Sequence, residues 1–384
     1  MLNKLIQYMY HFIIFIFIFS VFNDDFLVHY FGDNILKMII ILFIVSAFSD
    51  ILINIKTMNT LSDKIFFTFI GLLLVVFLLQ NIINMADNIL KPTFALLSMI
   101  VIVLFFSRYP INKFLYFVWF SIVFSIMICY FNEPLTEYTF RKTGGTGDPN
   151  NFAAQLLAFI FTSFYLYTQN KSKVYLLISI LFFTYGLFAA GSKSAFLIFA
   201  IITLFGILIK MKRLITPKNL LILMIPLIGM TQIDFSKIEA VSNMLGRANE
   251  TKTAGTRFAS WIAGLHMVEK HPILGVGMGQ YSKNSPKYAE TILREGSTAP
   301  HNTYIQLIAE TGVIVFSVFI FFLYVLMMKN LKIIINSEIF WIYFALLSLL
   351  LMGLTLGLTY LKFQWLFIAI MMQIHYLISK GKLK

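Results

Sequence analysis

Long runs of apolar residues, separated by short polar or charged segments, dominate the sequence. Each run is close to the ~20 residues that a helix needs to cross the hydrocarbon core of a bilayer. The runs are continuous and nearly free of interior charge, which favours helices over the alternating strands of a membrane barrel. We therefore predict an all-α polytopic integral membrane protein with about twelve transmembrane helices. The expected spans are Leu5–Phe22, Ile35–Ile53, Ile65–Ile83, Ile89–Phe106, Phe114–Phe131, Asn151–Tyr167, Val174–Ala190, Ser194–Ile209, Leu220–Ile233, Val313–Met328, Glu338–Tyr360 and Phe363–Ile378.

Lysine and arginine are distributed unevenly between the two sides that these spans define. The segments on the side of the N-terminus hold most of them, including four between Lys210 and Lys218. The short segments on the other side hold few, and the first of these is acidic at Asp24 and Asp25. The positive-inside rule therefore predicts that both termini are cytoplasmic. The formal charge of +13 is then mainly a topology signal, so nucleic acid is not an expected partner.

One polar segment late in the chain is much longer than the other connections, and the parity of the spans puts it on the outer face. We therefore expect an N-terminal transmembrane bundle at 1–233, a large outer catalytic loop with amphipathic helices at 234–312, and C-terminal transmembrane helices at 313–384. With 59% hydrophobic and 12% charged residues, the composition excludes a sizeable water-soluble catalytic domain. The single cysteine, Cys129, lies in an apolar run and excludes a disulfide framework.

Arg257 is the first candidate functional residue of this outer loop. Thr256 is a suitable N-cap, which would put Arg257 in the first turn of an amphipathic helix. A guanidinium group can hold a diphosphate through two parallel hydrogen bonds. The alternative is an interfacial helix whose arginine is solvated or paired with lipid phosphates. The apolar positions that follow helical spacing are Phe258, Trp261, Ile262, Leu265 and Val268.

His301 is the second candidate, at the end of the same loop. Pro300 suits the first position of a helix that continues into the next span. His301 would then lie in the first turn, where the helix dipole favours the neutral imidazole that can accept a proton. Asn302, Gln306 and Glu310 are four apart and form a polar stripe, which is costly in a membrane unless it faces a cavity or another polar group. The alternative for His301 is an interfacial hydrogen-bonding residue.

Two further outer connections contain basic residues. Arg141 and Lys142 open a glycine-rich loop that ends in Asp148 and Pro149, which suit the N-cap and first position of the next helix. Lys193 lies in a very short turn between two spans. Its side chain either extends to the membrane surface, as lysines at span ends commonly do, or binds a phosphate. The glycine-rich turn at 274–279 either brings backbone N–H groups to a phosphate or serves packing. The histidines lack paired ligand spacing, so no metal site is expected.

Several runs of the outer loop form a recognisable series. They are Gly255-Thr256-Arg257 with Trp261, then His271-Pro272-Ile273-Leu274-Gly275-Val276-Gly277, then His301-Asn302-Thr303-Tyr304, then Glu310-Thr311-Gly312. These runs, together with many spans and one large outer loop late in the chain, resemble the O-antigen ligase and polymerase superfamily of polytopic membrane glycosyltransferases. The turn with Lys193 resembles a place where that family usually carries an arginine, and lysine lacks the bidentate fork.

The resemblance implies a metal-independent, inverting transfer of an undecaprenyl-diphosphate-linked glycan onto an acceptor sugar hydroxyl, without a cofactor. Arg257 would contact the diphosphate and His301 the acceptor, with Lys193, Arg141, Asn302 and Glu310 as substrate-binding residues. The expected location is the bacterial cytoplasmic (inner) membrane. The expected partners are the lipid-linked glycan donor, a glycan or lipid A core acceptor, membrane lipids and, as a further candidate, a chain-length regulator.

Three functions fit this picture. A polymerase joins repeat units on the lipid carrier, and the segment from Gly147 to Ala153 and the run from His301 to Gly312 look more like polymerase relatives. A ligase instead moves the finished chain onto lipid A core. A transporter or flippase of lipid-linked glycan is a different class, but ion-coupled carriers need ionisable residues near mid-membrane, and the interior of these spans is nearly charge-free.

Overall fold

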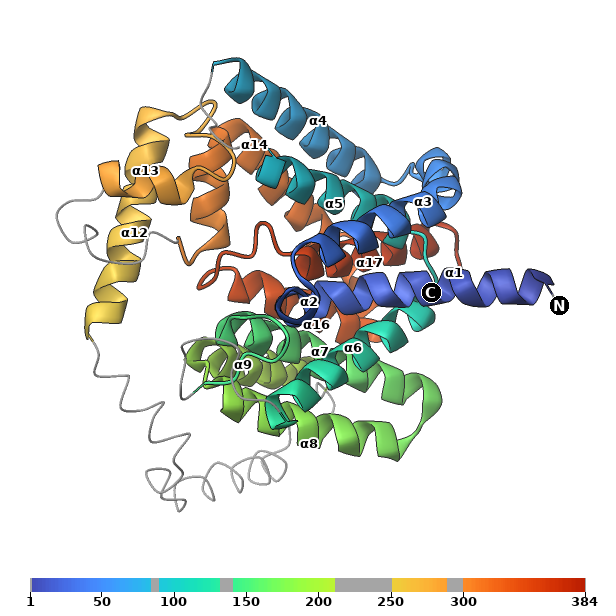
Figure 1. Cartoon of the computed structure of the whole chain (residues 1–384). Helices are drawn as coiled ribbons and strands as arrows, with labels where there is room; N and C mark the ends of the chain where they lie inside the picture. The colour runs from blue at the N-terminus through green and yellow to red at the C-terminus, as the bar shows by residue number, and fades with distance from the viewer. Residues whose placement is uncertain (1, 84–89, 132–140, 211–250, 289–299, 384) are drawn as a thin grey trace.

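The computed structural model describes residues 2–83, 90–131, 141–210, 251–288 and 300–383, and within these ranges the chain forms helices and no strands (Figure 1). The helices are α1 (Leu2–Phe22), α2 (Asp24–Phe31), α3 (Asn34–Thr57), α4 (Leu61–Ile82), α5 (Leu90–Phe106), α6 (Ile111–Phe131), α7 (Pro149–Asn170), α8 (Lys173–Ala190), α9 (Lys193–Lys210), α12 (Thr251–Lys270), α13 (Tyr281–Tyr288), α14 (Thr303–Met328), α15 (Leu331–Asn336), α16 (Phe340–Met352) and α17 (Lys362–Ser379).

Two helices, α7 and α17, form the centre of the molecule. Residues of α7 are buried from Phe152 to Ser163, and α7 packs most extensively against α16 and α8. Residues of α17 are buried from Phe363 to His375, and its main neighbour is α5. Helices α12 and α13 lie at the opposite side of the view from both chain ends (Figure 1). The candidate functional residues of α12 are therefore far from the termini.

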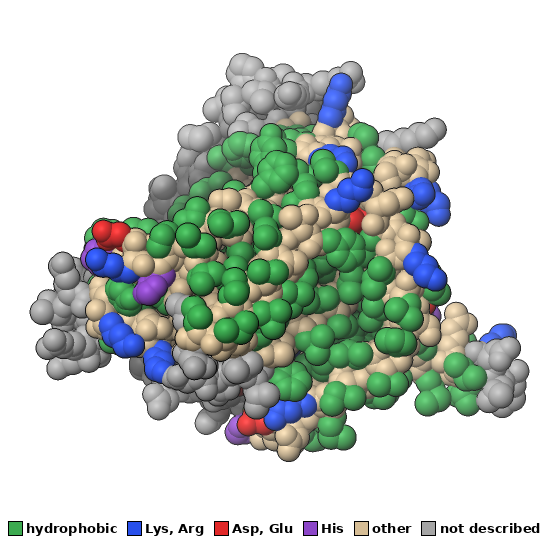
Figure 2. Space-filling model, turned by 90° about the horizontal axis from the view of Figure 1, so that it is seen from above, with side chains coloured by type: hydrophobic (Ala, Val, Ile, Leu, Met, Phe, Trp, Pro, Cys, Tyr) green, Lys and Arg blue, Asp and Glu red, His purple; other side chains and the backbone are tan. Residues whose placement is uncertain are grey.

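The peripheral helices expose apolar side chains, as lipid-facing helices do. Among the described residues, six helices are long and apolar enough to cross a membrane. On α3, for example, Met38, Val45 and Phe48 are all more than half exposed. One face carries a broad area of hydrophobic side chains, with Lys and Arg at its two ends (Figure 2). Apolar surfaces of this extent mark a lipid or protein interface. The chain is a helical polytopic membrane protein.

The predicted spans agree with the described helices at most positions. The ninth, Leu220–Ile233, lies outside the described residues, so the total of twelve and the three-region division stay predictions. The span Glu338–Tyr360 is wrong over its last third, because α16 ends at Met352 and residues 353–361 are irregular. This segment folds back on the start of α14, where Thr303 Oγ1 donates to the Leu356 carbonyl at 2.7 Å and accepts from Leu358 N at 2.8 Å.

Two predicted helix starts are also wrong. Helix α12 begins at Thr251, so Thr256 is not its N-cap and Arg257 lies in the second turn. Gly255 is a weak helix former but does not stop a helix. Helix α14 begins at Thr303, because the Asn302 side chain caps it by accepting from Tyr304 N and Ile305 N at 2.9 and 3.0 Å. His301 therefore precedes the helix. The continuation of α14 into the predicted span is confirmed, across a kink at Gly312.

Candidate functional site

Helix α12 carries Arg257 and packs through small residues. The buried positions of its packing face are Ser260, Ala263, Gly264 and Met267. A Cβ on Gly264 would lie 2.4 Å from Ile305 Cγ2, so only glycine lets α12 approach α14 this closely. The apolar face that the sequence indicated is divided: Phe258 and Leu265 point away from the protein, with 63% and 56% of their surface exposed, whereas Val268 packs against a buried cluster. The exposed pair forms the outer face of α12. This face suits contact with the membrane interface.

His301 is held in a short segment between α12 and α14. The Trp261 indole Nε1 donates to the Pro300 carbonyl at 3.0 Å, which ties the segment to α12. On the other side, the Asn302 Nδ2 donates to the Leu354 carbonyl at 3.0 Å. His301 has a left-handed φ of 45°. Such backbone conformations persist only where the surroundings fix them, and they cluster at functional sites.

The loop 141–148 brings a third element to His301. Asp148 caps α7 as predicted, with its Oδ1 accepting from Asn150 N at 2.7 Å and Asn151 N at 3.0 Å. Arg141 donates from Nε to the Ala190 carbonyl at 2.7 Å and from Nη2 to Asn150 Oδ1 at 2.8 Å. Two of its donors therefore attach the loop to the end of α8 and to the start of α7. Lys193 follows shortly after Ala190, as the exposed first residue of α9.

The electrostatic surroundings of His301 favour a neutral imidazole. Burial lowers the pKa of His301 below its ordinary value, and the positive charge of Arg257 lowers it further, while the Asp148 carboxylate partly opposes this. The buried Arg257 Nε has no hydrogen-bond partner among the described residues. A buried donor without a partner is rare in native proteins and points to a group that binds there. The arrangement therefore offers a proton acceptor beside a guanidinium that can still donate to an anion.

Glu310 lies in a buried cluster of its own. It is 1% exposed, and its carboxylate accepts from Tyr281 N at 3.2 Å and from the Tyr360 hydroxyl. The Gln80 side chain of α4 donates to the carbonyls of Glu310 and Leu274. The polar stripe of α14 thus faces other polar groups, one of the two arrangements that the sequence allowed. Its members Asn302 and Glu310 are engaged within the protein, so their predicted substrate contacts stay predictions.

The glycine-rich turn at 274–279 packs on the kink of α14. A Cβ on Gly275 would lie 2.4 Å from the Glu310 carbonyl carbon. Several backbone N–H groups of the turn have partners within the protein: Val276 N donates to the Ala309 carbonyl, Met278 N to Gln80 Oε1 and Gly279 N to the Tyr360 hydroxyl. These contacts support packing, one of the two roles that the sequence left open.

Sequence reasoning missed Gln80 and Tyr360. The adjacent amides Gln80 and Asn81 inside the apolar span Ile65–Ile83 were a usable signal for Gln80, because a buried amide needs partners. Tyr360 had no such signal, since tyrosine is common at span ends. In the described part of the chain, no three His, Cys, Asp or Glu side chains come together as a metal site.

Comparison with known families gives one finding. A family model described as O-Antigen ligase matches residues 177–320. The matched region contains Lys193, Arg257, His301 and Glu310, and it ends inside α14; Arg141 lies before it. No curated protein matches the chain significantly.

Proposed function

We propose that the chain, which matches a family model described as O-Antigen ligase over residues 177–320, is a member of the O-antigen ligase and polymerase superfamily and polymerises O-antigen or capsular polysaccharide at the outer face of the bacterial inner membrane. The donor is a glycan linked to undecaprenyl diphosphate, and the acceptor is a sugar hydroxyl. Both termini are cytoplasmic in this proposal, as the positive-inside rule predicts.

The observation that carries the proposal is the juxtaposition of His301 and Arg257. His301 takes the proton of the acceptor hydroxyl, whose oxygen attacks the anomeric carbon of the donor. The bond to the diphosphate breaks, and the lipid diphosphate leaves with the bonding electron pair. Arg257 holds the leaving group through its unpartnered donor. Attack opposite to the leaving group inverts the anomeric carbon, and no metal is needed for this sequence of steps.

The other predicted residues have supporting parts in this proposal. Lys193 is exposed and contacts an outer oxygen of the diphosphate as a point charge. Arg141 supports the loop that carries Asp148 and, in this proposal, contributes positive charge near the donor substrate. A chain-length regulator is a further partner of a polymerase.

A deletion strain complemented with wild type, His301→Ala or Arg257→Ala tests the function, with surface glycan analysed on gels. Wild type should restore the ladder and the two variants should not, at equal protein abundance. His29→Ala is the matched control, because His29 is an exposed histidine on α2. Retained activity in both site variants would refute the proposed mechanism.

The same gel separates the alternatives. A core with one repeat unit in the deletion strain indicates the polymerase. A core without any repeat, with long chains accumulating on the lipid carrier, indicates the ligase that attaches glycan to lipid A core. An unchanged ladder contradicts both and favours a lipid-linked oligosaccharide flippase.

Arg257→Lys should recover little transfer activity, since lysine keeps the charge but loses the planar pair of donors. The initial rate of transfer in proteoliposomes measures this, and a near-normal rate would mean that a point charge suffices.

EDTA should leave the transfer rate of the purified protein unchanged in the same assay. A loss that a divalent cation restores would contradict metal-independent transfer.

A further inference from the structure

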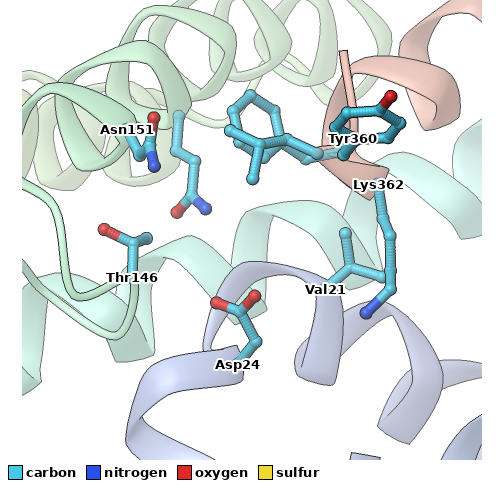
Figure 3. Close-up of a pocket in the computed structure, with 9 residues that line it drawn as sticks. Val21, Asp24, Thr146, Asn151, Tyr360 and Lys362 are labelled. Carbon is cyan, nitrogen blue, oxygen red and sulfur yellow. The ribbon is translucent and has the colours of Figure 1, made fainter. Parts of the chain in front are cut away.

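A polar cavity of about 50 Å³ lies between α2, the loop 141–148 with the adjoining start of α7, and the start of α17 (Figure 3). Asp24 begins α2, Thr146 belongs to the loop 141–148, and Lys362 begins α17. Asn151 and Gln155 of α7 complete the polar lining, together with Tyr360. Among these residues only Tyr360 takes part in the contacts described above for Glu310, so the cavity adjoins that cluster through this one side chain.

Two opposite charges face this cavity without pairing directly. The Asp24 carboxylate and the Lys362 ammonium both point into it (Figure 3). Burial raises the pKa of Asp24 to about 6, and attraction to Lys362 partly opposes the rise. Within the described part of the chain, no ion pair joins the two, and Lys362 makes no hydrogen bond. Asp24 Oδ1 accepts from Asp25 N at 3.1 Å, and its Oδ2 and the Lys362 ammonium are available to a ligand.

Gln155 provides an independent sign of a ligand. Its side chain is 1% exposed and lines the cavity, yet its Oε1 has no hydrogen-bond partner among the described residues. A buried amide oxygen without a donor is destabilising. Natural proteins retain such groups where something else supplies the donor. A hydroxyl group of a bound ligand would do so.

The chemistry of the lining selects the class of ligand. One carboxylate and one ammonium leave no net charge, so the cavity does not select a phosphate. The carboxylate accepts hydrogen bonds, the ammonium donates them, and the amides of Asn151 and Gln155 do both. Such a mixture matches the hydroxyl groups of a neutral sugar, and the rings of Tyr360 and Phe363 match its apolar C–H faces. The volume accommodates the hydroxyl edge of one sugar residue.

The cavity shares parts with the candidate site. Thr146 donates to the Asp148 carbonyl at 2.8 Å, and Asp148 is the carboxylate that acts on His301. Tyr360 lines the cavity, and its hydroxyl donates a hydrogen bond to the Glu310 carboxylate. We propose that Asp24, Lys362 and Gln155 form a subsite that binds one neutral sugar residue of the glycan. This proposal rests on the glycan-transfer function proposed above.

The test uses the full chain in lipid nanodiscs and two probes, each titrated calorimetrically. The first probe is the free oligosaccharide that mild acid releases from the lipid-linked glycan of the deletion strain. The second is inorganic diphosphate. Asp24→Asn and Lys362→Met should each weaken oligosaccharide binding by about tenfold or more and leave diphosphate binding unchanged. Asp33→Asn and Lys37→Met are matched controls, because both residues are exposed near the start of α3.

Gln155→Met keeps the test valid if a charge variant fails to fold. It removes an oxygen that has no partner among the described residues, so it should fold normally and still weaken oligosaccharide binding. Wild-type affinity in all three variants overturns the subsite, as does a wild type that binds no free oligosaccharide. Loss of oligosaccharide binding in Arg257→Ala would place the sugar at the diphosphate position and also overturn it. The transfer function itself is tested separately, by the gel analysis of surface glycan in the strain that carries His301→Ala.

Discussion

Gly312 and Gly32 form a matched pair for measuring how much a close backbone approach matters to the free energy of unfolding. Their backbone angles are nearly the same, with φ 81° and ψ 173° at Gly312 and φ 80° and ψ 164° at Gly32. A Cβ at Gly312 would lie 2.1 Å from the Ile273 carbonyl oxygen, whereas a Cβ at Gly32 would meet nothing within 4 Å. Substitution by alanine therefore adds the same backbone strain to both, and a steric overlap to Gly312 only.

The expected magnitudes follow from these contacts. The strain is about 1–3 kcal/mol at either position. To relieve the overlap at Gly312, the Ile273 backbone must move by about 1 Å. That shift disrupts the bonds from Val313 N to the Pro272 carbonyl and from Val276 N to the Ala309 carbonyl, each 2.8 Å long. At about 0.5–1.5 kcal/mol each, Gly312→Ala should be about 1–3 kcal/mol more destabilising than Gly32→Ala.

The free energy of unfolding of both variants is measured by SDS titration in mixed micelles. Each variant is compared with wild type, and the difference between the two variants is the quantity of interest. Equal destabilisation would refute the reasoning, because it would mean that the Ile273 backbone moves away from the new Cβ without breaking the two hydrogen bonds.

Two other predictions concern charges. Asp63→Asn should be destabilising by about 3–5 kcal/mol in the same titration, because it leaves Arg108, its partner at 2.8 Å, buried without an opposite charge; a value near that of exposed Asp33→Asn would contradict this. The transfer rate should be constant near pH 7 and fall only below pH 6.5, because His301 accepts a proton in its neutral form and its pKa is lowered. Asp148→Asn removes the charge that raises this pKa and should move the fall to lower pH; an unmoved profile would exclude His301 as the titrating base.

The helices could be predicted from the sequence because apolar runs of spanning length leave the backbone few alternatives in a membrane. Residues 353–361 could not. Leu354, Leu356 and Leu358 keep this stretch apolar, so it continues the pattern of α16. Its carbonyls are instead satisfied by Asn302 and Thr303, which lie about fifty residues earlier in the chain. Such pairing depends on tertiary contacts that one sequence does not reveal.

The candidate residues were predictable as residue types but not as an arrangement. Arg257 and His301 stood out because charged and ionisable side chains are rare in this chain. Nothing in the residue pattern indicates that Trp261 fixes the segment of His301 through the Pro300 carbonyl. Glu310 was predicted as a substrate-binding residue, which stays a prediction, but its contacts with Tyr281 N and the Tyr360 hydroxyl could not be predicted. A polar side chain in an apolar chain needs a hydrogen-bond partner. Which group becomes that partner depends on the tertiary fold.

Asp148 shows why a structural explanation of a residue does not exclude a functional one. Helix capping accounts for its presence, and only its Oδ1 accepts the two capping N–H groups in the described structure. The charge of the same carboxylate also acts on His301. An asparagine would cap α7 about as well, so capping alone does not require the charge. The pH profile of Asp148→Asn therefore separates the two roles: helix stability should be retained while the titration of His301 shifts.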